Sequence, residues 1–507
     1  MRLEYIAHSC FVLETGGKRI VFDPWITGSA YHDQWHLFPK PNDTSRVLNA
    51  DVILISHGHE DHMHSASLKM INKKARVFFP FQWRKGVAGY FRYLQFAEIT
   101  EAISFRTYCV DDVRITYLGY SLESVIVVEC EGQVLVNIND ALNSNHETAT
   151  TFLLKKIKKR WPKIDFLLSG WSGAGYFPNK VHYRSKDDAE VARIREQYFA
   201  DNFCKFAKYL QPAIAVPFAP GFVLLRNENR WINDVKFPRQ IIGEYYRDNF
   251  ESNTRIQFPI AYPGDYFEDK QFHAVSEFHG LKDDHEMYAN VDEEFAEEIE
   301  RVNRRVVFPD SSLEPLRVKL EKWMNRNKVL YKNKVVRDAV FSIRFTDTED
   351  SVVFNIVPRD GTLTARINTV TNQDDRLVIT TRASLLSLNL DKDWGGDLLS
   401  IGYGADIQVF EELSLEKNLD IVCMRLISRF PMFREDFVQH AGRIVRYYLT
   451  NPSIANLWIT QKIKLRSYVN KYPFNERDHW ITYNKCELCK VCNIPQWDFT
   501  AHRLADV

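Results

Sequence analysis

The 507-residue chain has no excess of either charge, because 66 lysines and arginines balance 66 aspartates and glutamates. Proteins that bind nucleic acids or anionic membrane surfaces normally carry a basic excess, so the balance argues against both partners. The sequence also lacks any run of the roughly 20 apolar residues that a membrane-spanning helix requires. Its first residues alternate like a strand and show no signal-peptide pattern. We therefore expect a cytoplasmic protein with no nucleic-acid partner and no membrane span.

Cysteine is scarce, with eight residues in the whole chain. Five stand in scattered apolar contexts and are expected to be buried, reduced thiols: Cys10, Cys109, Cys130, Cys204 and Cys423. The other three form a C-x2-C-x2-C cluster: Cys486, Cys489 and Cys492. That spacing suits zinc or part of an iron–sulfur cluster only if a fourth ligand joins it, and His502 is the candidate. The alternative is three reduced structural thiols.

What the chain does contain is typical of a globular protein of two or three domains, with 45% hydrophobic and 26% charged residues. Short β-branched and aromatic runs fill residues 1 to about 140, and helical patterns follow to about 210. A charged stretch near 265–330 predicts solvated helices, and alternating strands that resume near 336 predict an antiparallel sheet. We expect an α/β fold divided into residues 1–270, a helical connector at 271–335, and an α+β domain at 336–507.

The stretch "ISHGHEDHMH" (55–64) concentrates metal-ligand side chains directly after an apolar strand. A tight turn at the end of a strand can direct His57 and His59 to one ion, while Asp61 and His62 turn toward a neighbouring position. Imidazole and carboxylate donors together suit zinc, iron, manganese or cobalt, and open coordination positions mark a catalytic site. The alternative, a merely polar loop between strand and helix, accounts poorly for this density.

The pattern H-x-H-x-D-H after a strand resembles the signature of the metallo-β-lactamase fold. "AHSCFVLETGGKRIVFDPW" (7–25) resembles the opening of one subgroup of that fold, and "GQVLVNIND" (132–140) resembles its strand that ends in a metal-bridging aspartate. The resemblance implies an αββα sandwich followed by a second α+β domain. It also implies that Asp140 joins the metal ligands.

Further stretches, among them "DPWITGSAYHDQWHL", "LLSGWSGAGYFP" and "DWGGDLLSIGYGADIQV", resemble the catalytic part of the CMP-N-acetylneuraminate hydroxylase family. This likeness implies an iron-dependent oxygenase and a nucleotide-sugar or other anionic small-molecule substrate. The paired Cys-x-His segments of that family's Rieske domain are missing here. Electrons would then have to come from an external donor protein.

The sequence departs from the family at its third histidine for the first metal, where it reads "YLGYSLES". Glu123 is the nearest ligand-type side chain, with Tyr120 close by, and a diiron β-hydroxylase of the same superfold offers a precedent for glutamate there. A carboxylate in place of imidazole favours iron or manganese over zinc. The alternative is that Glu123 is a surface loop residue.

The last histidine expected for the second metal has no evident match either, so His146 or His182 could substitute for it. His8 is expected to line the pocket beside the metals, unless it is a satisfied core imidazole. Asp23 is expected to orient a ligand histidine through a hydrogen bond rather than bind metal. The loop at 31–41 is interpreted as lying over the site, and the glycine-rich loop at 170–178 as a pocket wall or simply a tight turn.

Three functions follow from these patterns. The favoured one is an iron oxygenase or hydroxylase acting on a polar, nucleotide-sugar-like metabolite. The second is a zinc or manganese hydrolase of a lactone, ester or phosphodiester, in which Asp61 and Asp140 orient the attacking water. The third is a binding module with a degenerate site. In the first two, one or two divalent ions are held by His57, His59, Asp61, His62, Glu123 and Asp140.

Overall fold

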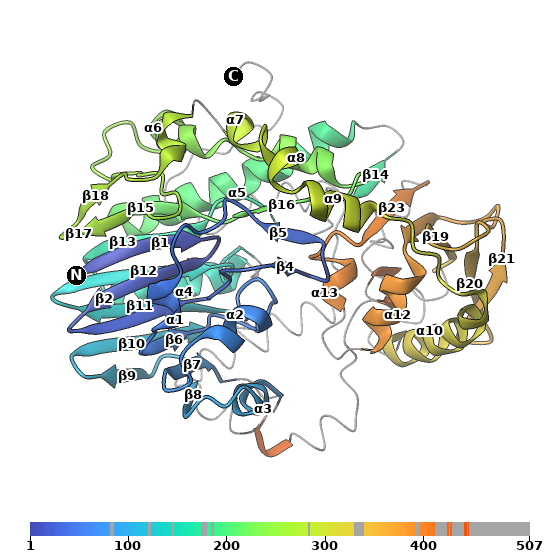
Figure 1. Ribbon diagram of the computed structural model, residues 1–507, viewed down its shortest axis with the longest axis horizontal. Coiled ribbons are helices and arrows are strands. Elements are labelled where there is room, and N and C mark those ends of the chain that lie inside the picture. Colours follow the sequence, from blue (N-terminus) through green and yellow to red (C-terminus); the bar gives the residue numbers. More distant parts are fainter. Residues whose placement is uncertain are drawn as a thin grey trace.

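The computed structural model describes residues 1–81, 86–119, 123–143, 147–173, 180–183, 187–281, 284–328, 339–391 and 396–410, together with 423–424, 426–427, 441–443 and 445. Within these ranges a two-sheet sandwich carries the N-terminal part of the chain, and a separate sheet carries the later strands (Figure 1).

The first sheet of the sandwich has eight strands, in the spatial order β18 (Gln271–His273), β17 (Tyr266–Glu268), β1 (Arg2–Ala7), β2 (Cys10–Thr15), β3 (Lys18–Phe22), β6 (Val52–Leu54), β7 (Arg76–Pro80) and β8 (Glu98–Ala102). β1 to β3 form an antiparallel meander, while β3, β6, β7 and β8 run parallel. Parallel neighbours need crossover connections. Those crossovers contain α1 (Ser45–Leu48), α2 (Ser65–Met70) and α3 (Gly86–Tyr93).

The second sheet has six strands, in the order β15 (Pro212–Phe218), β13 (Ile164–Gly170), β12 (Gln133–Asn139), β11 (Ser124–Cys130), β10 (Val113–Gly119) and β9 (Thr107–Val110). Its outer face carries α4 (Glu147–Arg160), α5 (Asp188–Leu210) and α6 (Ile242–Asn249). The predicted long helix is confirmed as α5. Asp187 caps it by accepting the Glu190 N–H, and Gln211 ends it in a left-handed conformation just before Pro212.

Alternating side chains explain why both sheets are covered on two faces. On β2, Phe11 and Leu13 enter the core between the sheets, whereas Cys10 and Val12 face the first helical layer. On β11, Ile126 and Val128 point inward, and Val125 and Val127 face the second helical layer. The result is four layers, helix–sheet–sheet–helix, which confirms the expected αββα sandwich.

A small three-stranded sheet, β16 (Phe222–Val223), β5 (Trp35–Leu37) and β4 (Ser29–Ala30), lies beside the sandwich. The segment that follows is largely helical, and within the charged stretch near 265–330 the helices begin at Glu277, after the strands β17 and β18. It holds η1 (Arg230–Val235), η2 (Arg239–Ile241), η3 (Glu277–Gly280), α7 (Asp284–Tyr288), α8 (Val291–Glu294), α9 (Ala296–Asn303), η4 (Asp310–Ser312) and α10 (Leu313–Asn327).

The third large sheet has the order β14 (Val181–Tyr183), β23 (Ala405–Val409), β22 (Leu377–Thr381), β19 (Phe341–Phe345), β20 (Val353–Arg359) and β21 (Thr362–Asn368), accompanied by α12 (Ala383–Asp391) and α13 (Gly396–Leu399). The prediction of an antiparallel sheet is wrong in part, because β22 runs parallel to β19, and β14 parallel to β23. The chain returns from β21 to the far side of β19 instead of continuing the hairpin. We call this sheet and its helices the second domain.

The second domain shares one apolar cluster with the sandwich. Trp25, Tyr31 and Trp35 pack in the same core as Phe341 and Leu386. β14 comes from the N-terminal half of the chain but pairs within the second domain's sheet. The two parts are therefore joined by a continuous core as well as by the chain.

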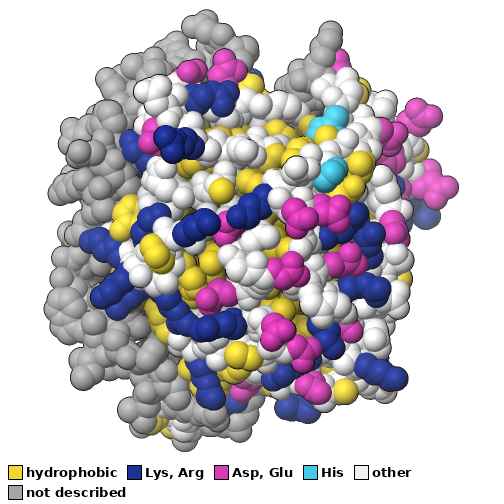
Figure 2. All heavy atoms as spheres, turned by 90° about the vertical axis from the view of Figure 1, so that its left-hand side faces the viewer, with side chains coloured by type: hydrophobic (Ala, Val, Ile, Leu, Met, Phe, Trp, Pro, Cys, Tyr) yellow, Lys and Arg dark blue, Asp and Glu magenta, His cyan; other side chains and the backbone are white. Residues whose placement is uncertain are grey.

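On the face shown in Figure 2, basic and acidic side chains are interspersed. This agrees with the zero net charge of the sequence. Among the described residues, no helix combines the length and apolar character needed to cross a membrane. Four of the five scattered cysteines are buried, but the prediction is wrong for Cys109, which is exposed. It lies on β9, which is the last strand of the second sheet among the described residues.

Candidate metal centre

The histidine-rich stretch forms the loop between β6 and α2. His64 ends this loop as the N-cap of α2, where its side chain accepts the Ser67 N–H. Its Nε2 lies 3.1 Å from the Ser29 carbonyl, so the ring is used structurally. Glu60 accepts the Tyr31 backbone N–H. The side chains of Glu60 and His64 therefore hold the loop in place. The other ligand-type side chains of the loop are His57, His59, Asp61 and His62, and these can form a site.

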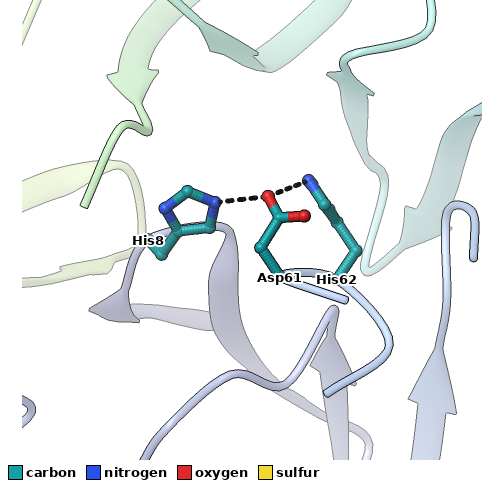
Figure 3. A group of neighbouring side chains, drawn as sticks. All are labelled: His8, Asp61 and His62. Atoms are coloured by element: carbon teal, nitrogen blue, oxygen red, sulfur yellow. Dashed lines mark hydrogen bonds and ion pairs between the residues drawn. The ribbon is translucent and has the colours of Figure 1, made fainter. Parts of the chain in front are cut away.

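One group of ligand-type side chains comprises His8, Asp61 and His62, all nearly inaccessible to solvent (Figure 3). Asp61 Oδ2 lies 3.0 Å from His8 Nε2 and 3.2 Å from His62 Nε2. One ligand atom from each residue lies within 4.8 Å of the others. His8 follows β1 and the other two follow β6, so the ends of two strands meet here. We call these residues the buried group.

Asp23 fixes His62, one of the two histidines of the buried group. Its carboxylate accepts the Ser56 N–H and the Ser56 hydroxyl, each at 2.7 Å, and lies 3.0 Å from His62 Nδ1. A proton on Nδ1 leaves the Nε2 lone pair of His62 for a metal. Because the Ser56 hydroxyl donates to Asp23, its oxygen can accept from His57 Nδ1, 2.9 Å away. Both His57 and His62 thus present Nε2, and Asp23 has the orienting place predicted for it.

Two further contacts hold the rest of the buried group. The Tyr31 hydroxyl donates to Asp61 Oδ1 at 2.5 Å, and the Gly221 N–H donates to His8 Nδ1 at 2.9 Å. Since Nδ1 of His8 accepts a hydrogen bond, the ring proton belongs on Nε2, which donates to Asp61. In this arrangement His8 lines the site as a donor and supports Asp61.

The second group comprises His57, His59 and Asp140, and it is more open. His57 is buried, but the Asp140 side chain is 36% exposed. Asp140 Oδ2 lies 3.7 Å from His57 Nε2 and 3.4 Å from His62 Nε2, between the two groups. His57 Nε2 and His59 Nδ1 are 2.7 Å apart, a distance that requires a proton between the two nitrogens. We call these residues the open group.

The charges around the open group come from both domains. Burial by itself lowers the pKa of His59, but neighbouring carboxylates outweigh it and the pKa is raised. In order of their effect, these carboxylates are Asp397, Glu123, Asp61 and Asp140. Glu123 precedes β11 and is 8% exposed, so it is not a surface loop residue. Asp397 belongs to α13 of the second domain.

The donor set fits divalent cations. Burial lowers the pKa of His62, yet the carboxylates of Asp61, Asp140 and Asp23 outweigh it and leave the pKa well above its usual range. Together with the raised pKa of His59, this reflects the negative charge of the carboxylates gathered around the two groups. Imidazole nitrogens and carboxylate oxygens converging on such a place are the ligands of catalytic divalent metals.

One predicted residue lies away from both groups, and several others fall outside the described residues. Tyr120, His146, the four C-terminal candidates Cys486, Cys489, Cys492 and His502, and most of the 170–178 loop are outside the described residues. His182 does not join either group, because its Nδ1 lies 2.7 Å from Asp188 and its Nε2 2.9 Å from Asp406. The prediction of a loop over the site holds for Tyr31, although nothing in the sequence singled out that residue. Asp397 lies in the stretch "DWGGDLLSIGYGADIQV", which resembles the hydroxylase family, but the sequence did not indicate it as a site residue.

The four-layer αββα sandwich is the architecture of the metallo-β-lactamase fold. Residues 2–141 match the family model described as the beta-lactamase superfamily domain. That segment contains His8, the whole of the β6–α2 loop and Asp140, so both groups of ligand-type residues fall within the matched domain.

The chain is also similar in sequence to curated proteins of known name. The cytidine monophosphate-N-acetylneuraminic acid hydroxylase of Danio rerio is 27% identical over 249 residues, which are 46% of this chain and 40% of the relative. The inactive human form is 26% identical over 259 residues, 46% of this chain and 48% of the relative. The match thus spans less than half the length of these relatives.

Among solved structures, CmlA, a diiron β-hydroxylase from Streptomyces venezuelae, has a TM-score of 0.35 and 16% identity, covering 51% of this chain and 52% of that one. An isothiocyanate hydrolase from Delia radicum gut bacteria has a TM-score of 0.38 and 13% identity, covering 54% of this chain and 100% of that one.

Proposed function

We propose that this chain is an iron-dependent oxygenase that hydroxylates a polar metabolite of the nucleotide-sugar kind. The observation that carries the proposal is the carboxylate-rich donor set: Asp61, Asp140 and Glu123 accompany the histidines, with Asp397 close to His59. Oxygen-rich sites favour iron or manganese over zinc. The similarity of the matched segment to CMP-N-acetylneuraminic acid hydroxylases supports the choice of substrate class.

In this proposal each group of residues would hold one metal ion. His62 and Asp61 would hold one ion, His57, His59 and Glu123 the other, and Asp140, which lies between the groups, would contact both. Iron bound there would supply oxygen activation, whereas zinc or manganese would supply an activated water. His8 Nε2–H offers a hydrogen bond at the buried end. The more exposed Asp140 marks the side from which a substrate would approach.

Hydroxylation by O2 also needs a source of electrons. One atom of O2 enters the C–H bond of the substrate and the other leaves as water, which consumes two electrons and two protons. The Cys-x-His pairs of a Rieske cluster are missing from this sequence. We propose an electron-donor protein as the source of these two electrons.

A zinc or manganese hydrolase is the second candidate, and the position of Asp140 favours it. A carboxylate between two ligand groups is the arrangement that two-metal hydrolases use to clamp a reacting centre. In this alternative Asp61 and Asp140 orient the attacking water on a lactone, ester or phosphodiester.

Metal analysis of protein purified without oxygen or chelators separates the candidates. Two equivalents of iron, an oxygen-sensitive optical spectrum and donor-dependent hydroxylation of CMP-N-acetylneuraminate would support the oxygenase. Stoichiometric zinc with activity on a panel of lactones and phosphodiesters would overturn it in favour of the hydrolase. Failure to bind any divalent metal would overturn both and leave a binding module. The variant Asp140→Ala is the inactive control in each assay.

A further inference from the structure

The second domain contacts the metal centre through a buried glutamine. Gln34, only 1% exposed, lies between β4 and β5 in the loop over the site, and its Nε2 donates to the Leu398 carbonyl at 2.7 Å. The same nitrogen lies 3.0 Å from the carbonyl of Tyr31 and donates to it as well. One amide group therefore links α13 of the second domain to the backbone of the residue that bonds Asp61. Figure 1 shows α13 beside β4 and β5, which flank this loop.

The second domain approaches this link so closely that only glycine fits. A Cβ on Gly402 would lie 2.5 Å from Gln34 Nε2 and 2.9 Å from Tyr31 Cβ. A Cβ on Gly404 would collide with the Leu398 carbonyl and with Gln34 Oε1. The Gly402 N–H donates to the Asp397 carbonyl at 2.8 Å, which ties this turn to α13. The glycines of "SIGYG" are thus explained by close packing on Gln34 and Tyr31.

We propose that the second domain is a working part of the metal centre, with Leu398, Gln34 and Tyr31 forming a strut that sets the position of Asp61. Tyr31 is a positioning residue: its hydroxyl occupies one oxygen of Asp61 and leaves the other facing His8 and His62. The inference rests on the proposed metal centre and adds to it the role of a domain that lies outside the matched segment 2–141. Reciprocity then requires metal binding to tighten the domain junction.

Cobalt(II) binding to the full chain tests the strut, because its visible absorption reports the ligand field independently of any activity. Gly402→Ala would displace Gln34 and Tyr31, and Tyr31→Phe would remove only the hydroxyl. Each variant is expected to weaken Co2+ binding at one site by about 10- to 100-fold, the usual effect of losing an outer partner, and to shift the absorption bands. Gln34→Leu, which removes both hydrogen bonds, should behave alike.

Gly361→Ala is the matched control. Gly361 lies in the β20–β21 turn of the same domain with φ +75° and no neighbour within 4 Å of an added Cβ. Its substitution strains the second domain without touching the strut. This variant is expected to lower thermal stability while leaving Co2+ affinity and the spectrum within about twofold of the parent.

Each result has a separate meaning. If the parent protein binds no Co2+, the metal centre itself is wrong. If the parent binds Co2+ while Gly402→Ala and Tyr31→Phe match it in affinity and spectrum, the strut is wrong and the metal centre stands. If Gly361→Ala weakens binding as much as Gly402→Ala does, the effect is general destabilisation and the strut is again overturned. Hydrogen exchange at residues 398–404 should slow when Co2+ is added to the parent.

Discussion

The buried and open groups differ in how their side chains are held. In the buried group, His62 is fixed by Asp23, Asp61 by Tyr31, and His8 by the Gly221 N–H. In the open group, Ser56 bonds His57, but Asp140 is 36% exposed, and the strongest charge acting on His59 is Asp397 of the second domain.

This difference indicates a division between a preorganised half and an adaptable half. Side chains locked by hydrogen bonds lose little entropy when an ion binds, so the buried group should bind first and more tightly. The open group is more exposed to solvent at Asp140, and it takes its charge from two domains. The following experiments test whether the two groups differ in this way, and they are ordered by the size of the expected effect.

His62→Ala should abolish binding at the buried group and reduce activity by more than the roughly 100-fold that loss of an outer partner can cost. The reason is that His62 Nε2 lies near both Asp61 and Asp140. Metal stoichiometry and turnover are the measurements. His59→Ala, the paired variant, should keep the buried metal. Equal losses in the two variants would remove the distinction between the groups.

Asp23→Asn should weaken metal binding at the buried group by about 10- to 100-fold, because the amide no longer supplies a charged acceptor for His62 Nδ1 and Ser56. Isothermal titration with Co2+ measures the change. The exposed Asp43 bonds Ser45 far from the site, so Asp43→Asn serves as the control and should bind as the parent does. Unchanged affinity in Asp23→Asn would contradict an orienting role.

Glu123→His should raise the preference for zinc over iron by on the order of 10-fold, or about 1.4 kcal/mol, since imidazole replaces a hard oxygen donor. Competition between the two metals under anaerobic conditions measures this ratio. Glu129→His is the control, because Glu129 lies on β11, the strand that begins directly after Glu123, and its side chain is partly exposed. An unaltered ratio would mean that Glu123 acts only through its charge.

The smallest effect concerns the junction that brings Asp397 to the open group. Burial lowers the pKa of His182, but hydrogen bonds to Asp406 and Asp188 outweigh it, and the pKa is raised. This contribution to stability is complete below the unfolded pKa of about 6.5 and is lost as pH rises through the higher folded pKa. We expect less than about 1 kcal/mol.

Urea unfolding at pH values on both sides of this window measures the loss. His182→Gln should remove that part of the pH dependence. His273→Gln, at a site stacked on Tyr266 at the edge of the first sheet, should retain it. If both variants keep the full slope, the His182 contacts with Asp406 and Asp188 do not contribute to the pH dependence.

Much of the fold follows from local patterns. The alternation in β2 and β11, the apolar strand β6 and the capped helix α5 are legible in the sequence because strand and helix periods are properties of neighbouring residues. The pairing of β19 with β22 was not predictable in the same way, since it depends on where the chain returns after β21.

His57, His59, Asp61 and His62 could be proposed as ligands from the sequence because six consecutive positions at the end of a strand bring them together. The residues that hold and complete the site are far away along the chain. Gln34 and Leu398 are 364 positions apart, and His8 and Gly221 are 213 apart. The loop that carries the candidate ligands could be recognised from the sequence alone. The hydrogen bond from Tyr31 to Asp61 and the effect of the Asp397 charge on His59 became evident only in the folded chain, because both depend on how distant segments pack.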